Sequence, residues 1–332
     1  MNSVVVLGPD LKKTYTGPQT PDQINIKAYR NVTCYPPEGM IFKGLKPIAL
    51  DQITKQRIKY RFPWRNLLPV KKYKKKSVLL LTGKNHASFG HYFLEQFPRL
   101  LRFLKFKESE SIKDFDILAS KGNYNHIRQI IKIFDLEVNK IHTLKNIPLK
   151  FEELFYVNPP SNAYKMFNQT DFVILKKLLS NLHFNSQSSL SENLFLTRTN
   201  APRRRLINEI RVFDIFKDYL PDIEMVDLGQ FSLLEQIKII KNTKVLVGPN
   251  GQSFASSIFG QKILHNIVLS PCSPPPFSWA CKFASISTLL GGQGSVLYSA
   301  ESTDRSFHQD WQYSEKALHK QLEQVSLPAT RS

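Results

Sequence analysis

A strand, a glycine-rich turn and a helix over residues 244–259 constrain the fold of this chain more than any other stretch. Residues 245–247 are an apolar run typical of a buried strand, and a Gly-Pro-Asn-Gly turn follows at 248–251. The two glycines allow a sharp turn and a close approach of the backbone to a ligand. A helix beginning near Gln252, at the carboxyl end of a strand, points free N–H groups outward, where they favour phosphate. The pattern also fits an ordinary strand-to-helix turn.

The size and charge of the chain limit the classes of protein to which it can belong. With 332 residues, 42% of them hydrophobic, it can bury a sizeable core, and its length suggests about two domains. Its formal net charge of +19 indicates an anionic partner, such as nucleic acid, anionic lipid or a phosphorylated substrate. The three cysteines form no CxxC pair, which argues against a disulfide framework or a zinc cluster.

The hydrophobic pattern contains neither a signal peptide nor a membrane span. Residues 4–7 are apolar, but no basic region precedes them, and no window reaches the roughly 18 unbroken apolar residues that a span requires. We therefore expect a cytoplasmic protein. Its positive charge also allows peripheral contact with the anionic inner face of a membrane.

Turn signals and the alternation of strands with helices divide the chain into four parts. Residues 1–76 are rich in turn signals and predict an arm of irregular or short β structure. Strand and helix patterns alternate over residues 77–185 and again over 193–300, with a polar linker between them. This alternation predicts an α/β protein with two Rossmann-like domains. Residues 301–332 form a polar tail that we expect to be partly helical.

The expected elements follow from hydrophobic periodicity and from capping residues. Strands are expected at residues 78–81, 115–118, 140–144, 154–157, 194–196, 224–226, 245–247, 266–269 and 295–298. Helices are expected at residues 89–106, 125–134, 171–183, 206–220, 232–241 and 315–324. Ser232 and Glu235 have the spacing of a capping box at the start of one of these helices.

A cluster of arginines follows the strand predicted at residues 194–196. Arg198 comes two residues after this strand, and three more arginines occupy residues 203–205. Guanidinium groups hold phosphate oxygens in a planar fork, so such a cluster suits a pyrophosphate. Because ligands of doubly wound sheets bind at the carboxyl ends of the strands, this loop and the 248–251 turn can face one crevice. The three consecutive arginines cannot all face one ligand, and we expect at least one to be merely exposed.

His91 and Glu95 form a second candidate site. On a helix, residues four apart lie on one face, and a carboxylate beside an imidazole is a suitable general base. Two structural alternatives remain open: His91 as a satisfied structural histidine, and Glu95 paired with Arg99. Pro98 is expected to kink or divide this helix.

Taken together, these motifs resemble those of glycosyltransferase family 61, over roughly residues 77–270. The first half of the resemblance is carried by Asn85, Gly90, His91, Glu95, Pro98, Arg99 and Leu100. The second half is carried by Arg198, by Arg204 or Arg205, by Asn208 and Glu209, by residues 231–236 and by the 248–251 turn. Asn250 replaces the family's histidine in this turn and Ser256 replaces an asparagine, and an asparagine cannot carry a proton.

The resemblance implies an inverting, metal-independent glycosyltransferase of GT-B-like architecture that performs hexosyl or pentosyl transfer. It places a nucleotide-sugar donor in the second domain and requires no bound metal or other cofactor. Donor-binding residues would be Arg198, Arg204, Asn208, Glu235, Gln236, Asn250, Gly251, Gln252 and Ser253. Within this set, the two arginines and the amides of residues 251–253 would hold the diphosphate, and Glu235 or Gln236 would contact the ribose or the sugar. The catalytic base would be Glu95 or His91, with Asn85, His86 and Arg99 on the acceptor side.

The resemblance further implies a role in bacterial surface polysaccharide synthesis, such as capsule or lipopolysaccharide, with a glycan or lipid-linked acceptor. The alternative from charge alone is a non-catalytic nucleic-acid-binding α/β protein. The aromatic residues do not favour it, because they occupy apolar periodic positions and do not alternate with lysine and arginine. The aspartates at 114 and 116 have the spacing of a metal-binding pair, but they begin a predicted strand, and we interpret them as structural.

Overall fold

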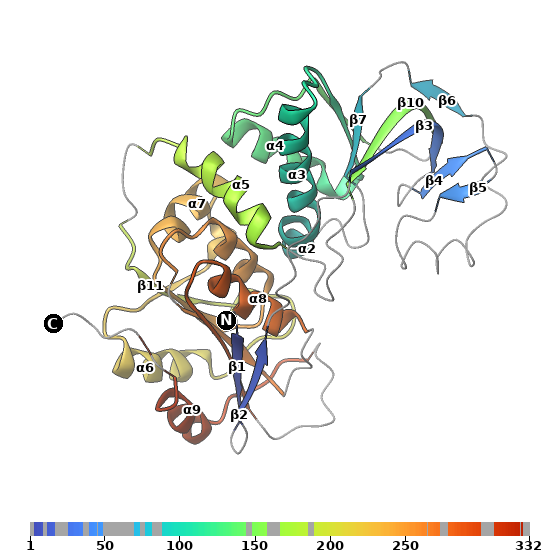
Figure 1. Cartoon of the computed structure of the whole chain (residues 1–332). Helices are drawn as coiled ribbons and strands as arrows, with labels where there is room; N and C mark the ends of the chain where they lie inside the picture. The colour runs from blue at the N-terminus through green and yellow to red at the C-terminus, as the bar shows by residue number, and fades with distance from the viewer. Residues whose placement is uncertain are drawn as a thin grey trace. The chain divides into compact units, whose positions relative to one another are not determined.

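The structure of the chain is a computed structural model that divides into two compact units (Figure 1). Unit 1 combines Met1–Thr20 with Leu182–Ser332, and unit 2 is Pro21–Asn181. The structure describes residues 3–8, 12–16, 26–35, 40–44, 46–48, 70–73, 77–81, 88–143, 148–157, 167–184, 189–263, 265–272, 278–299, 309–325 and 327.

Unit 1 is built on a seven-stranded sheet with the order β12-β11-β13-β14-β15-β1-β2. All neighbours in this sheet are parallel except β1 and β2, which are antiparallel. Its strands are β1 (Ser3–Leu7), β2 (Lys12–Thr16), β11 (Asn193–Leu196), β12 (Glu224–Val226), β13 (Val245–Pro249), β14 (His265–Ser270) and β15 (Gln293–Tyr298). Its helices are α6 (Glu209–Tyr219), η4 (Leu228–Gln230), α7 (Leu233–Asn242), η5 (Gln252–Phe259), α8 (Trp279–Leu289) and α9 (Glu315–Leu322).

The strand order of unit 1 reverses between β11 and β13. The chain passes outward from β11 to β12, then returns across β11 to form β13 and continues through β14 and β15. In open parallel sheets, such a reversal separates the loops at the carboxyl ends of the two central strands and leaves a crevice where ligands bind. The sheet therefore presents its reversal point at the loops that follow Leu196 and Pro249.

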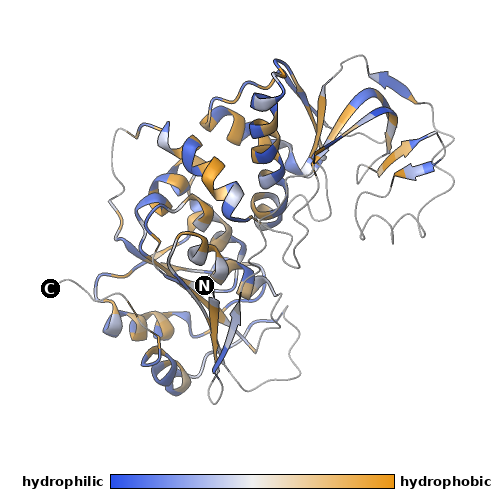
Figure 2. Cartoon of the chain, viewed as in Figure 1, coloured by the Kyte–Doolittle hydropathy of each residue, from blue (hydrophilic) through white to orange (hydrophobic). Residues whose placement is uncertain are grey.

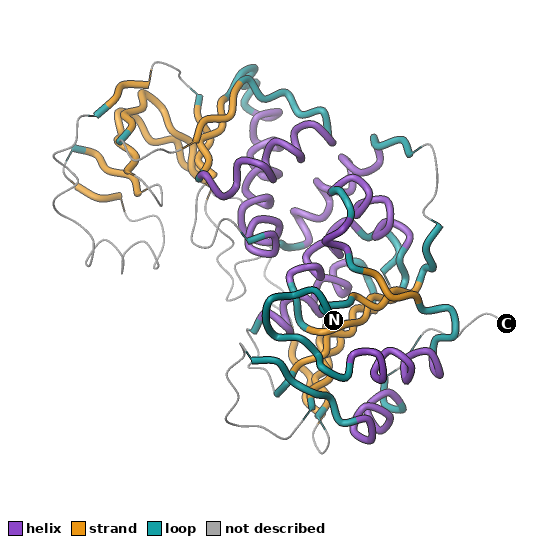
Figure 3. Tube along the Cα trace, turned by 180° about the vertical axis from the view of Figure 1, so that it is seen from behind, coloured by secondary structure: helices purple, strands orange, loops and turns teal. Residues whose placement is uncertain are grey.

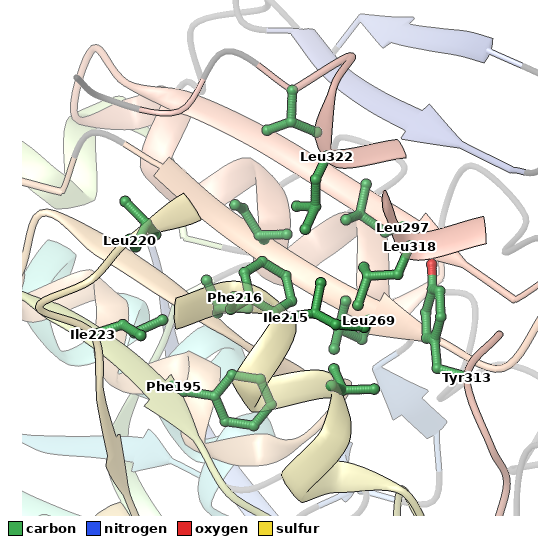
Figure 4. Close-up of a cluster of buried hydrophobic side chains, with 14 of the residues drawn as sticks. Phe195, Ile215, Phe216, Leu220, Ile223, Leu269, Leu297, Tyr313, Leu318 and Leu322 are labelled. Carbon is green, nitrogen blue, oxygen red and sulfur yellow. The ribbon is translucent and has the colours of Figure 1, made fainter. Parts of the chain in front are cut away.

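Helices cover both faces of this sheet (Figure 3). On one face, α6 and α9 pack over the strands around a cluster of buried side chains, including Phe216, Leu269 and Leu318 (Figure 4). On the other face, α8 packs on β14 and β15, and η5 contacts both α7 and α8. Because helices cover both faces, β13 and β14 are buried along their whole length. The polar side chains of His265 and Asn266 at the start of β14 are hydrogen-bonded. Figure 2 shows hydrophobic colour in the sheet of unit 1.

Unit 2 contains a second mixed sheet, with the order β5-β4-β3-β10-β7-β8-β9 and with β6 beside β10. The β10-β7-β8-β9 part is parallel, whereas β3, β4 and β5 extend it with antiparallel pairs. Its strands are β3 (Ile26–Tyr35), β4 (Met40–Lys43), β5 (Lys46–Ile48), β6 (Lys71–Tyr73), β7 (Val78–Leu81), β8 (Asp116–Ala119), β9 (Lys140–Thr143) and β10 (Leu149–Val157). Its helices are α2 (Phe89–His91), η2 (Tyr92–Gln96), α3 (Phe97–Ser109), η3 (Lys121–Asn123), α4 (Tyr124–Ile133) and α5 (Gln169–Ser180).

The α/β class expected from the sequence is confirmed, and each predicted strand and helix has a counterpart. The first 76 residues differ from the single arm that was expected, because β1 and β2 belong to the sheet of unit 1 and β3–β6 to that of unit 2. The helix expected over residues 89–106 contains a π-helical turn at Tyr92–Gln96, and Pro98 lies in the first turn of α3, where a missing N–H is tolerated. In the described part of the chain, no helix is long and apolar enough to cross a membrane.

Candidate functional site

Arg198 follows the end of β11, and a buried carboxylate fixes the loop that carries it. Glu209, at the start of α6, is only 3% exposed. It accepts a hydrogen bond from the backbone N–H of Arg198 at 2.9 Å, and from the hydroxyls of Thr197 at 2.5 Å and Thr199 at 2.6 Å. Bonds to an ionised acceptor are stronger than neutral ones. The first turn of α6 therefore holds the loop after β11 in one conformation.

This network predicts a clear effect on stability. We expect Glu209→Ala to lower the free energy of unfolding by about 2–4 kcal/mol, because it leaves three donors without their acceptor, two of them on the half-buried residues Thr197 and Arg198. Urea denaturation measures this change. Asp214→Ala is the matched control, since Asp214 is an exposed carboxylate on the same helix. Equal, small effects of the two substitutions would contradict this role of Glu209.

The turn after β13 lies against β11 and beneath Arg198. Gly248 has φ +153°, and a Cβ there would lie 2.5 Å from the carbonyl oxygen of Leu196. A Cβ on Gly251 would lie 2.4 Å from Nη1 of Arg198 and 3.2 Å from its Cδ. At Gly248 only glycine allows this approach, because the neighbouring atom belongs to the backbone; a Cβ at Gly251 would displace the guanidinium of Arg198. The structure thus brings Arg198 and the glycine turn together at the same edge of the sheet.

Arg198 and Arg204 form a pair of half-buried guanidinium groups at this edge. Burial lowers the pKa of Arg198, the positive charges of Arg204 and Arg203 lower it further, and the charge of Glu209 opposes them. Burial and the charge of Arg203 also lower the pKa of Arg204. The Nε atoms of both side chains are buried without a hydrogen-bond partner among the described residues. Adjacent positive charges with unused donors are costly when isolated, and an anion would relieve that cost.

The neighbouring arginines have different roles. Nε and Nη2 of Arg205 donate hydrogen bonds to Oδ2 of Asp310, at 2.9 and 2.7 Å. Arg203 is exposed, and its carbonyl oxygen accepts a hydrogen bond from Nη2 of Arg198 at 3.1 Å. The expectation that the three consecutive arginines do not all face one ligand is consistent with these contacts. Of Arg204 and Arg205, it is Arg204 that lies beside Arg198.

The helix expected after the turn is present as the 3₁₀ helix η5, which begins at Gln252. Its first backbone bond runs from the N–H of Phe254 to the carbonyl of Gly251, at 3.3 Å. The N–H groups of Gln252 and Ser253 precede that bond and belong to the open end of the helix. Asn250 is different, because its N–H donates to the carbonyl of Leu269 in β14 at 2.8 Å.

In unit 2, His91 and Glu95 contact each other across the π-helical turn. Nδ1 of His91 and Oε1 of Glu95 are 3.1 Å apart, and the side chains are 22% and 26% exposed. Tyr92 and Phe93, in the same turn, are fully buried. The turn that carries the pair is therefore packed against apolar side chains. Such turns are frequent at functional sites. This contact matches the expectation that the two side chains share one face.

Of the three expected acceptor-side residues, the structure describes only Arg99. Its side chain is largely buried, and its guanidinium carbon lies 5.3 Å from the centroid of the Tyr156 ring. Asn85 and His86 lie outside the described residues.

Comparison with known proteins identifies the family of this chain. A family model described as Glycosyltransferase 61 matches residues 89–266. The chain belongs to glycosyltransferase family 61. The matched range includes the His91–Glu95 pair of unit 2 and the Arg198 loop and glycine turn of unit 1. No curated protein matches the chain. Membership makes the protein a glycosyltransferase, with a sugar donor and an acceptor as its substrates.

Three residues expected to bind the donor in this family 61 protein make contacts within unit 1. The amide of Asn208 donates to the carbonyl of Tyr313 at 2.9 Å and accepts from its N–H at 3.0 Å. Glu235 completes the expected capping box with Ser232, and these bonds lower its pKa. The amide of Gln236 donates to the carbonyl of Phe231 and accepts from Ser256, both at 3.0 Å. Both amide atoms of Asn208 and Gln236 and one carboxylate oxygen of Glu235 thus have partners within unit 1.

Asp116, the second of the two closely spaced aspartates, fits the structural interpretation. Asp116 is completely buried at the start of β8. It accepts from the hydroxyl of Tyr73 at 2.6 Å and from Asn139 at 2.9 Å, and it pairs with His142 at 2.9 Å. Among the described residues, no group of histidine, cysteine and acidic side chains is arranged to hold a metal ion.

Sequence reasoning missed Asp227, which lies at the same edge of the sheet as Arg198. It follows β12 directly, and its carboxylate accepts from the N–H of Gly229 at 3.0 Å and lies 3.4 Å from the amide nitrogen of Asn200. Thr197 and Thr199 were also overlooked, although hydroxyls on both sides of an arginine at a strand end are a usable signal. The role of Glu209 was not predicted, because a glutamate in the first turn of a helix is common.

Proposed function

We propose that this protein is an inverting glycosyltransferase that takes its sugar from a nucleotide-sugar donor and works without a metal ion. The observation that carries the proposal is the Arg198–Arg204 pair at the reversal point of the unit 1 sheet: Arg198 lies over Gly251, and both side chains have a buried Nε without a hydrogen-bond partner among the described residues. The strand order supports a Rossmann-like donor domain, and we assign unit 2 the acceptor side of a GT-B-like enzyme.

The proposed role of the arginine pair is to neutralise the departing diphosphate. When the bond from the anomeric carbon to the phosphate oxygen breaks, negative charge develops on the nucleoside diphosphate, and fixed donors stabilise it most at that moment. Arg198 and Arg204 supply two positive charges on partly buried side chains. The N–H groups of Gln252 and Ser253 add uncharged hydrogen-bond donors. Such an arrangement performs the task that a divalent cation performs in metal-dependent transferases.

The acceptor side requires a proton acceptor, and we assign it to the His91–Glu95 pair. In the proposed step, the acceptor hydroxyl gives its proton to Glu95 while its oxygen bonds to the anomeric carbon from the face opposite the leaving group. The configuration at that carbon is therefore inverted. His91, 3.1 Å away, orients the carboxylate and shares the proton. The alternative assignment, with His91 as the base, uses the same contact.

The net charge of +19 supports an acceptor that is anionic or carried at an anionic membrane face. We propose a glycan or lipid-linked acceptor in bacterial surface polysaccharide synthesis, acted on from the cytoplasm. A mass-spectrometric screen of nucleotide sugars with whole-cell lipid extract as acceptor tests the proposal. The expected result is a glycosylated product that forms equally well in the presence of EDTA. Loss of product with EDTA would contradict metal independence, and no product from any donor would contradict the transferase itself.

The base assignment predicts a separation of binding from turnover. We expect Glu95→Gln to slow turnover by about 10²–10⁴-fold, because the amide cannot accept the proton. Calorimetric titration should show unchanged affinity for the nucleoside diphosphate. Glu108→Gln is the matched control, since Glu108 is an exposed carboxylate of α3. Full turnover in Glu95→Gln with loss in His91→Ala would assign the base to His91, and full turnover in both would exclude the pair.

A further inference from the structure

We propose that the segment of residues 309–325 holds Arg204 in its binding conformation, and that Asp310 is the positioning residue. The inference rests on the proposed function, because it concerns the same diphosphate site. This segment lies outside the range matched by the family model. It is therefore a part of the donor site that the family motifs do not describe.

A continuous set of hydrogen bonds joins this segment to the residues after Arg204. The N–H of Arg205 donates to Asp310 Oδ1 at 2.8 Å, and the N–H of Trp311 donates to the carbonyl of Arg205 at 3.0 Å. The N–H of Ile207 then donates to the carbonyl of Trp311 at 2.8 Å. Leu206 and Trp311 form a parallel bridge within this set. Main-chain bonds from the segment thus fix the backbone that follows Arg204.

The backbone of Arg204 needs such support. Its φ is +60°, in the left-handed region that costs a residue with a side chain about 1–2 kcal/mol. On its amino-terminal side, the carbonyl of Arg203 is held by Arg198. The guanidinium of Arg205, its backbone N–H and that of Arg204 hold the pKa of Asp310 below its usual range. One carboxylate therefore holds both the guanidinium and the backbone N–H of Arg205, the residue that follows Arg204.

The segment itself is anchored in the core of unit 1, independently of Asp310. Tyr313, Leu318 and Leu322 belong to the buried cluster on the α6 face of the sheet (Figure 4). The hydroxyl of Tyr313 donates to Gln321 at 2.5 Å, and Gln321 donates to the carbonyl of Tyr298 at 3.0 Å. The Asp310–Arg205 pair lies at the surface, where ion pairs contribute little to stability. Loss of the Asp310 carboxylate should therefore affect the position of Arg204 more than the fold.

Electrostatics and positioning predict opposite results for Asp310. If the carboxylate acted only through its charge, its removal would strengthen the binding of an anion. If it positions Arg204, its removal weakens that binding. We expect Asp310→Ala in the full chain to weaken inorganic pyrophosphate binding about tenfold in calorimetric titration, with a melting temperature close to that of the wild type. Asp310→Asn keeps an acceptor oxygen for the backbone N–H groups and should retain most of the affinity.

A double substitution tests whether Asp310 acts through Arg204. Arg204→Ala with Asp310→Ala should bind pyrophosphate no more weakly than Arg204→Ala alone. The control is Glu315→Ala, which removes an exposed carboxylate of the same segment and should leave the affinity unchanged. Unchanged or tighter binding by Asp310→Ala, or additive losses in the double variant, would overturn the inference alone. Wild-type protein that fails to bind pyrophosphate would overturn it together with the proposed diphosphate site.

Discussion

Replacing Arg198 by alanine is expected to weaken nucleoside diphosphate binding about 10–100-fold. The side chain lies directly over Gly251, and each charge-assisted hydrogen bond to a phosphate is worth about 1.5–3 kcal/mol. Calorimetric titration with nucleoside diphosphates measures the loss. Arg198→Lys should recover only part of it, because an ammonium keeps the charge but not the planar fork.

Arg203→Ala is the matched control for this prediction. Arg203 belongs to the same loop and has the same charge, but its side chain is exposed. A small loss for Arg203→Ala and a large loss for Arg198→Ala would show that position, and not net charge, determines affinity. Equal losses would mean that the loop attracts anions only through its summed charge, and the diphosphate site as built would be wrong.

Breaking the ion pair between Arg102 and Asp171 should destabilise unit 2 by about 3–5 kcal/mol, because the remaining charge is buried alone. Nε and Nη2 of Arg102 donate to the two carboxylate oxygens at 2.6 and 2.7 Å, and the side chains are 1% and 0% exposed. The same carboxylate completes the capping box at the start of α5. We expect Arg102→Ala to lower the urea midpoint of unit 2 accordingly.

The exposed pair between Lys177 and Glu108 joins the same two helices and serves as the control. Its atoms are 3.8 Å apart, and both side chains are mostly exposed. Surface pairs contribute about 0–1 kcal/mol, so Lys177→Ala should change stability little. A loss below about 1 kcal/mol for Arg102→Ala would contradict the view that this contact joins α3 to α5.

Features of the sequence that depend on neighbouring residues predicted the structure well. The capping box of Ser232 and Glu235 was predicted because its partners are three residues apart, and β13 was predicted from its run of apolar residues. Helix α8 was missed because small and polar residues interrupt its apolar ones, so that no clear periodicity appears. The hydroxyls of Ser287 and Thr288 donate hydrogen bonds to backbone carbonyls of the same helix. These bonds allow polar residues in a buried helix.

Contacts between residues far apart in the chain could not be predicted from the sequence. Arg204 and Arg205 are adjacent and chemically identical, and only the contact with Asp310, 105 residues away, gives them different roles. The contact between the amide of Asn208 and Tyr313, at the same sequence separation, could not be predicted from local patterns either. The pairing of β1 with β15 is likewise a contact between the two ends of the chain. Local patterns therefore located the arginine loop without showing which of its side chains remain available.

The central claim is that the Arg198–Arg204 pair and the turn at Gly251 bind a diphosphate. Calorimetric titration of the wild-type protein with a panel of nucleoside diphosphates, the matching monophosphates and the free nucleosides tests it most directly. We expect that at least one diphosphate binds, that its monophosphate binds more weakly, and that Arg204→Ala reduces the difference. Folded protein that binds none of the diphosphates, or that binds the monophosphate equally well, would contradict it.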